Sequence, residues 1–205
     1  IARRYPCVVI SGRSRADALR RLRGVGAVEV IGNHGIEPWQ TSQRGLLAVR
    51  RWQPTLARRL ARLPGVRIEN KVYSVAVHYR QSREKKKVRM AIHRTAAALG
   101  DVRLIRGKQV VNLLPNDAPH KGIALEKART RFQCDTALYV GDDDTDEDVF
   151  ALDQPGQLLT IRVGSKRDTL AGYFLRDQAE IDQLLHVLLS VGPERRQRAV
   201  TSAGQ

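Results

Sequence analysis

The sequence predicts an α/β protein in which an α+β module is inserted into a core built on a parallel sheet. Three observations support this fold class. Short apolar strands alternate with helical segments near both ends of the chain, as is typical of parallel sheets covered by helices. Between these ends, a helix followed by two strands occurs twice. Residues 36–115 carry 18 basic and 4 acidic side chains, a net charge of +14, whereas the remaining residues have a net charge of +1.

The core elements follow from hydrophobicity and from helix signals. CVVI (7–10) is a short apolar strand, and Ser14 is a good N-cap for a helix to Leu22, with Asp17 at the third position as in a capping box. A strand at 27–31 then ends at the turn-like GNHG. After Pro115 we expect helices at 120–131, from Thr145 and at 177–190, with strands at 136–140 and 158–163.

The middle of the chain predicts two strand pairs, each preceded by a helix. The segment VYSVAVHYR (72–80) alternates apolar and polar residues, as a half-buried strand does. We expect helices at 42–63 and 83–99, strands at 66–70 and 72–80 after the first helix, and strands at 102–106 and 109–114 after the second, turning at Gly107–Lys108.

The predicted domains are a discontinuous core of residues 1–35 and 116–192 and a cap of residues 36–115. The polar end, residues 193–205, is expected to be disordered. No apolar run is long enough to cross a membrane, and no leader precedes a cleavage site. Cys7 and Cys134 lie beside apolar runs, so we expect buried free thiols in a reducing cytoplasm. We also expect a monomer.

The stretch GDDDTDED (141–148) places six carboxylates in seven positions at the end of a predicted parallel strand. If Thr145 caps the next helix, the last three acids favour its positive end. The first three lie in the loop, where they either point into water or surround a cation. Oxygen-rich loops of this kind suit Mg²⁺, which uses one or two carboxylates and keeps several waters. We therefore expect a magnesium site at this edge of the sheet.

Two further features point to the same edge. Ser11, between the first strand and the first helix, can offer a hydroxyl and backbone N–H groups to an anion, although Ser-Gly also makes simple turns. Lys121 lies in the first turn of a helix, where a cation opposes the helix dipole at a cost of up to about 1 kcal/mol. A lysine that reaches a phosphate beside a metal is a better explanation than chance.

With these motifs in this order, the chain resembles the haloacid-dehalogenase (HAD) phosphatase superfamily, which has a Rossmannoid parallel-sheet core. The motifs are SGR, KG and GDDDTDEDVF (141–150). Within that superfamily, GNHGIE (32–37), IENKVYSVAVHYR (68–80) and the acidic motif resemble the trehalose-6-phosphate phosphatases. The resemblance covers nearly the whole chain.

The resemblance implies Mg²⁺-dependent hydrolysis of trehalose 6-phosphate in trehalose biosynthesis through an aspartyl-phosphate. A trehalose-phosphate synthase is an implied partner. The implied phosphate-binding residues are Ser11, Gly12, Arg13 and Lys121, with Ser11 and Lys121 in the catalytic set. The implied metal-site residues are Asp142, Asp143 and Asp146. The implied sugar-binding residues are Asn33, His34, Gly35, Glu69, Lys71, Arg80, Lys108 and Asn112.

The chain departs from the family pattern at two places. Asn112 and Leu114 stand where the family usually has a glutamate and an arginine, so the choice of sugar is less secure. No Asp-x-Asp pair precedes Ser11, and IARRYP looks like the end of the first helix. We therefore expect the nucleophile to lie upstream of residue 1, and the chain alone to be an inactive, unstable piece.

Three other functions stay open at this stage. One is a related phosphatase acting on sucrose phosphate or another sugar phosphate. Another is a non-catalytic domain that binds sugar phosphate or regulates a synthase. The third, a nucleic-acid binder, is disfavoured because the basic region has few aromatics and no recognition motif.

Overall fold

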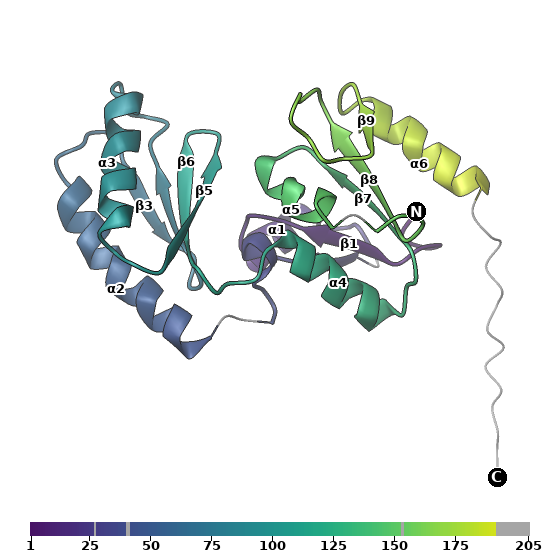
Figure 1. The fold of residues 1–205 in the computed structure, drawn as a ribbon, viewed down its shortest axis with the longest axis horizontal. Helices are drawn as coiled ribbons and strands as arrows, with labels where there is room; N and C mark the ends of the chain where they lie inside the picture. Colours follow the sequence, from purple (N-terminus) through teal and green to yellow (C-terminus); the bar gives the residue numbers. More distant parts are fainter. Residues whose placement is uncertain (27, 40–41, 153, 192–205) are drawn as a thin grey trace, which may run out of the picture.

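The computed structural model describes residues 1–26, 28–39, 42–152 and 154–191. It contains three sheets arranged in two lobes (Figure 1). The parallel lobe is made from residues 1–35 and 116–191. The antiparallel lobe is made from residues 43–115. No helix among the described residues combines the length and the apolar character that a membrane span needs.

The chain enters the parallel lobe through a small β-α-β unit. Strand β1 (Cys7–Ile10) pairs in parallel with β2 (Val28–Ile31), and α1 (Arg15–Arg21) connects them. Ser14 caps α1 as predicted, because its hydroxyl accepts a hydrogen bond from the backbone N–H of Asp17 at 3.3 Å. The short 3-10 helix η1 (Asn33–Gly35) follows β2, so the GNHG turn lies at the same end of the sheet as Ser11.

The second half of the parallel lobe holds the acidic loop. Strands β7 (Ala137–Gly141), β8 (Leu158–Val163) and β9 (Tyr173–Leu175) are parallel. Helices α4 (Lys121–Phe132), α5 (Glu147–Phe150) and α6 (Glu180–Val191) belong to this part, with η2 (Asp144–Asp146) before α5. Among the described residues, β1 is backbone-paired with β2 alone and β7 with β8 alone. The two sheets meet instead through apolar side chains, because Ile10 packs on the cluster that contains Tyr139 and Phe150.

The antiparallel lobe places two helices on one face of a four-stranded sheet. Strands β3 (Arg67–Asn70), β4 (Val75–His78), β6 (Val110–Pro115) and β5 (Val102–Gly107) lie side by side in that order. Helices α2 (Gln43–Leu60) and α3 (Lys85–Ala97) cover the face that carries Val75, Val77, Val111 and Leu113. The cross-strand neighbours Glu69, Ala76, Asn112 and Ile105 therefore share the opposite face, which is turned toward the parallel lobe (Figure 1).

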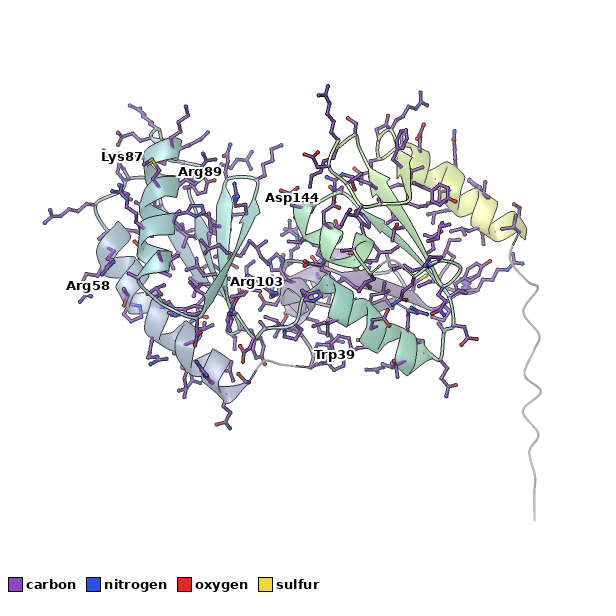
Figure 2. All side chains as sticks on the ribbon, viewed as in Figure 1. Trp39, Arg58, Lys87, Arg89, Arg103 and Asp144 are labelled. Atoms are coloured by element: carbon purple, nitrogen blue, oxygen red, sulfur yellow. The ribbon has the colours of Figure 1, made fainter. Side chains whose placement is uncertain are left out.

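The exposed side of α2 and α3 is strongly cationic. Within 43–62 and 83–97 the one acidic residue is Glu84. Figure 2 shows Arg58 and Lys87 on these two helices, away from the parallel lobe. The exposed cations are Arg44, Arg50, Arg51, Arg58, Arg59, Arg62, Arg83, Lys85, Lys86, Lys87, Arg89 and Arg94. Much of the basic charge of the middle region thus lies on the side of the sheet that faces away from the site residues.

The α/β fold class is confirmed, and so are the predicted strands and helices, within a few residues at their ends. The assignment of Thr145 as N-cap is wrong, because Asp143 forms the cap and a capping box with Asp146, and the α-helix begins at Glu147. Strand β9 was not predicted. The N-terminal residues make a turn, not a helix, and Cys7 and Cys134 are free but only partly buried. The predicted disordered end, 193–205, lies outside the described residues, and the domain bounds stay a prediction.

Candidate active site

A buried ion pair lies at the centre of the acidic loop. Lys121 Nζ donates to Asp146 Oδ1 at 2.8 Å, with the two side chains 8% and 4% exposed. The phenol of Tyr139 donates to the same oxygen at 2.6 Å, and the N–H of Asp143 donates to Oδ2 at 2.8 Å. Burial, and then the charge of Asp146, raise the pKa of Tyr139 far above its usual value, so the phenol remains a donor. Gly141 is required beside this carboxylate, because a Cβ there would lie 2.3 Å from Asp146 Cγ.

Two more cations neutralise the outer part of the loop. Arg162, which is buried on β8, donates to the Glu147 carboxylate at 2.9 Å and to the backbone carbonyl of Asp142 at 3.0 Å. Lys166 bonds Asp144 at 2.9 Å and lowers the pKa of that carboxyl group. From the sequence we expected water or a bound metal to balance these carboxylates, and the motifs did not point to Arg162 or Lys166. A lone arginine inside the apolar strand LLTIRV was the available signal for Arg162.

The predicted metal-site residues differ in how free their carboxylates are. Asp142 is exposed, and among the described residues its carboxylate makes neither a hydrogen bond nor an ion pair. Asp143 is also exposed, and its carboxylate accepts from the N–H of Asp144 and, in the capping box, from the N–H of Asp146. Asp146 already has protein donors on both oxygens, and the described part of the chain contains no group of three or more potential ligands. One or two carboxylates completed by waters are what Mg²⁺ requires, so Asp142 and Asp143 fit such an ion and Asp146 does not.

The SGR loop is held mainly by backbone hydrogen bonds to β2 and to the GNHG turn. The N–H of Ser11 donates to Ile31 O at 2.8 Å, and the N–H of Arg13 donates to the Ser11 hydroxyl at 3.1 Å. The Arg13 side chain is exposed and pairs with Asp17 at 2.9 Å. The groups of this loop that can still bind an anion are therefore the Gly12 N–H and the Ser11 hydroxyl. The Arg13 guanidinium pairs with Asp17 instead.

The GNHG turn contacts the antiparallel lobe directly. The Asn33 amide donates to Lys71 O at 3.0 Å and accepts from the Ser74 hydroxyl at 2.5 Å. Lys71 Nζ donates to the carbonyl of Gly12 at 3.1 Å and to the Asn112 side chain at 3.3 Å. Burial lowers the pKa of Lys71. The structure thus brings Gly12, Asn33, Lys71 and Asn112 together where the lobes meet.

His34 lies beside this junction with its ring enclosed. Its two ring nitrogens are buried, and neither has a hydrogen-bond partner among the described residues. Burial and then the charges of Lys71 and Lys121 lower the pKa of His34 to about 3, so the ring is neutral. The ring fills the space beside Gly12, where a Cβ would lie 2.5 Å from Cε1 of His34. Gly35 is also constrained, because its φ is +115° and a Cβ there would lie 2.8 Å from His120 O.

The remaining predicted sugar-binding residues are not brought together. The Glu69 carboxylate bonds the His78 ring at 2.7 Å on the sheet face that is turned toward the parallel lobe. Arg80 and Lys108 are exposed and make no hydrogen bond or ion pair with the described residues. Two residues of this face were not predicted from the sequence: His78, and Arg103, which lies directly across from Leu114 in the β5–β6 pair.

A cavity lies elsewhere, along α4. It has a volume of about 620 Å³ and is lined by residues that include Trp39, Ile123 and Leu152. None of the predicted site residues lines it. We place the candidate site where the lobes meet, because the contacts of Gly12, Asn33, Lys71 and Asn112 lie there.

A parallel α/β core with a lysine–aspartate pair beside an acidic loop, next to an antiparallel α+β lobe, is the architecture of the HAD-like phosphatases. A solved trehalose-6-phosphate phosphatase related protein matches 93% of this chain and 83% of its own, with a TM-score of 0.69 and 26% identity. The C-terminal domain of the Candida albicans trehalose-6-phosphate phosphatase shares the fold, with a TM-score of 0.68 and 20% identity over 89% of this chain and 77% of that one. The family model for trehalose-phosphatase matches residues 1–179, and the chain belongs to this family.

Curated relatives show the same relationship over part of their length. The probable trehalose-phosphate phosphatase 4 of Oryza sativa subsp. japonica is 28% identical over 205 residues, which cover 90% of this chain and 56% of the relative. The trehalose-phosphate phosphatase of Mycobacterium avium is 33% identical over 169 residues, which cover 73% of this chain and 42% of the relative. The chain therefore spans about half the length of these curated relatives.

Proposed function

We propose that this chain carries the phosphate-binding and sugar-binding parts of an enzyme that hydrolyses trehalose 6-phosphate to trehalose and phosphate. The observation that carries the proposal is the buried pair of Lys121 and Asp146, beside the free carboxylate of Asp142. An ammonium group has three donors, and Asp146 uses one of them. The other two are left for the oxygens of a phosphoryl group. Tyr139 and the N–H of Asp143 hold Asp146, so the lysine is fixed before substrate binds.

The acidic loop is proposed to hold a magnesium ion through Asp142 and Asp143. When bound, the ion supplies positive charge that stabilises the phosphoryl oxygens. Arg162 keeps the backbone of both residues in place, because its guanidinium donates to their carbonyl groups at 3.0 and 3.4 Å. The side chain of Asp142 is thereby left free for the metal.

The attacking group is proposed to be an aspartate on a further strand between β1 and β7. Each of these strands has one edge without a partner among the described residues, and both contribute to the same apolar cluster. The aspartate would attack phosphorus and release the sugar, and water would then hydrolyse the aspartyl-phosphate. Lys121 and the Ser11 hydroxyl would bind the oxygens of the transferring group during both steps.

The antiparallel lobe is proposed to be the cap, within residues 36–115, that recognises the sugar. Its face toward the parallel lobe offers a carboxylate at Glu69, an ammonium at Lys71 and an amide at Asn112. Sugar hydroxyls require donors and acceptors together, and these three groups supply both. Roles for Asn33, His34 and Gly35 in the same pocket are part of the proposal.

Other expectations stay predictions. Sugar contacts by Arg80 and Lys108 have no supporting contact in the structure. A trehalose-phosphate synthase partner, a monomeric state and a cytoplasmic location are likewise predictions.

The test is phosphate release by the full-length protein from trehalose 6-phosphate, with sucrose 6-phosphate as the competing substrate, over a range of magnesium concentrations. Asp142→Asn should remove most of the activity, because it loses the metal's negative ligand. Asp135→Asn is the matched control, since Asp135 is an exposed aspartate just before the opposite end of β7. If the protein prefers sucrose 6-phosphate, the proposed substrate is wrong. If Asp142→Asn is as active as Asp135→Asn, Asp142 is not a metal ligand.

A further inference from the structure

Arg103 links the antiparallel lobe to the backbone just before Lys121. It lies on β5, and its guanidinium Nη2 donates to the carbonyls of Ala118 and Pro119, each at 3.1 Å. Figure 2 shows Arg103 between the two lobes. The two carbonyls belong to the parallel lobe and come three and two residues before Lys121.

The segment that Arg103 binds is also fixed from its other side. The His120 ring caps α4 by accepting from the N–H of Gly122 at 3.2 Å. Gly122 lies against α5, because a Cβ there would be 2.5 Å from Asp148 O. Ala118 also packs against Leu114 of β6 in a buried apolar cluster. The position of Lys121 therefore depends on contacts of α4 with α5, on this apolar contact and on Arg103.

Arg103 is not part of a self-contained structural ion pair. Among the described residues, no carboxylate forms an ion pair with it, and Asp148 acts on it only at longer range. Its Nε is buried without an acceptor in the described part of the chain. Desolvation of an arginine without a carboxylate partner is costly and lowers the pKa of Arg103.

Lys71 makes an equivalent contact on the other side of the site. Its Nζ donates to the carbonyl of Gly12, in the loop that carries Ser11. Each lobe-joining cation thus binds a backbone carbonyl close to a proposed phosphate-binding side chain. In this position of the antiparallel lobe, its two cations bind the loop that carries Ser11 and the backbone just before Lys121.

We propose that Arg103 is a positioning residue that makes the placement of Lys121 depend on the position of the antiparallel lobe. The inference rests on the proposed function, since it concerns how Lys121 meets the phosphoryl group. Arg103 acts on backbone that is common to every substrate, so its effect concerns phosphoryl transfer and not recognition of the sugar.

The experiment compares Arg103→Met and Arg103→Lys with Arg58→Met in the full-length protein. Arg58→Met is the matched control, because Arg58 is an exposed arginine of the same lobe without a hydrogen bond or ion pair among the described residues. Hydrogen exchange of the amides in 118–124 should become roughly tenfold faster in Arg103→Met, because local opening becomes easier. This readout does not require any enzymatic activity.

The kinetic readout uses trehalose 6-phosphate and p-nitrophenyl phosphate. With both substrates, Arg103→Met should lower kcat by roughly 10- to 100-fold with little change in KM, as misplacement of a catalytic group does. Arg103→Lys should restore part of this loss, since an ammonium can still donate to the carbonyls. Unchanged exchange in 118–124, or a loss confined to the disaccharide, would overturn the proposal. Absence of phosphatase activity in the unmodified protein would reject the proposed function, and the exchange measurement would still decide the role of Arg103.

Discussion

Replacing Lys121 by methionine should destabilise the protein far more than the same change at Lys166. The two lysines make ion pairs of nearly equal length, 2.8 Å to Asp146 and 2.9 Å to Asp144. They differ in burial, because the first pair is 8% and 4% exposed and the second is 31% and 70% exposed. Burial therefore decides the expected size of each effect.

Breaking one side of a buried ion pair typically costs about 3–5 kcal/mol, because the remaining charge is left without its partner. Asp146 keeps two donors, from Tyr139 and from the N–H of Asp143, so we expect the lower end, about 3 kcal/mol. For a chain of this length that corresponds to a fall in melting temperature of about 6–12 °C. The exposed pair of Lys166 is worth about 0–1 kcal/mol, or at most about 4 °C.

The assay is thermal and urea unfolding of the unmodified protein, Lys121→Met and Lys166→Met at the same pH and salt. The double variant of Lys121→Met with Asp146→Asn should lose less stability than the two single variants together, because the second change removes the isolated charge. Equal losses for the two lysine variants would refute the argument, since they would show that Asp146 is solvated in the protein. Additive losses in the double variant would show that the two groups do not interact.

Other expected outcomes concern pH, packing, selectivity and salt. Because the folded protein lowers the pKa of His34 from 6.5 to about 3, the unfolded chain binds the extra proton, and stability should fall as pH drops below 6.5, by at most about 1.4 kcal/mol per pH unit. The free energy of unfolding, measured with urea between pH 4.5 and 7, should depend less steeply on pH in His34→Asn than in the unmodified protein. The same pH dependence in both proteins would contradict the buried neutral ring. Gly12→Ala should cost about 1–3 kcal/mol because its Cβ would meet the His34 ring, whereas Gly26→Ala, with no atom within 4 Å of a Cβ, should melt close to the unmodified protein. Glu69→Ala should reduce kcat/KM for trehalose 6-phosphate much more than for p-nitrophenyl phosphate, and equal losses would assign Glu69 to the fold alone. The value of kcat/KM should also fall between low and physiological ionic strength, because the net charge of +14 in 36–115 attracts an anionic substrate; a flat profile would exclude such steering.

The fold could be predicted from the sequence because its signals are local. The strand signal in 72–80 and the cap at Ser14 depend on neighbouring residues, and the structure contains a strand at Val75–His78 and the cap. The expected alternation in burial is absent there, because Val75, Ala76 and Val77 are all buried. Strand β9 escaped prediction because it has three residues, two of them exposed aromatics, and pairs with β8 alone among the described strands. Its existence depends on a neighbour that is distant in sequence.

The error at Thr145 also has a tertiary cause. The run DDDTD offers two capping residues, and propensity alone does not separate Asp143 from Thr145. Lys121 and Tyr139 hold the Asp146 carboxylate, and this places Asp143 at the start of the helical turn.

The site was predictable where motifs mark residues, as at Lys121 and Asp142. It was not predictable where an arginine acts across elements. Arg162 meets the acidic loop from 15 to 20 residues away, and Arg103 meets the segment before α4 from the other lobe. The apolar run LLTIRV marks Arg162 as unusual but does not reveal its partners, and no local pattern distinguishes Arg103 from the exposed arginines.

The cationic outer side of α2 and α3 makes the charge distribution of the molecule strongly asymmetric. Its charge lies at one end, while the face that carries Glu69 and Asn112 lies on the other side of the same sheet. At low salt an anionic support would therefore attract the protein by its outer helices, and screening would release it as the Debye length shortens to about 8 Å at physiological salt. Protein immobilised in this way would be held by the end remote from its chemistry, with the junction between the lobes still open to solution.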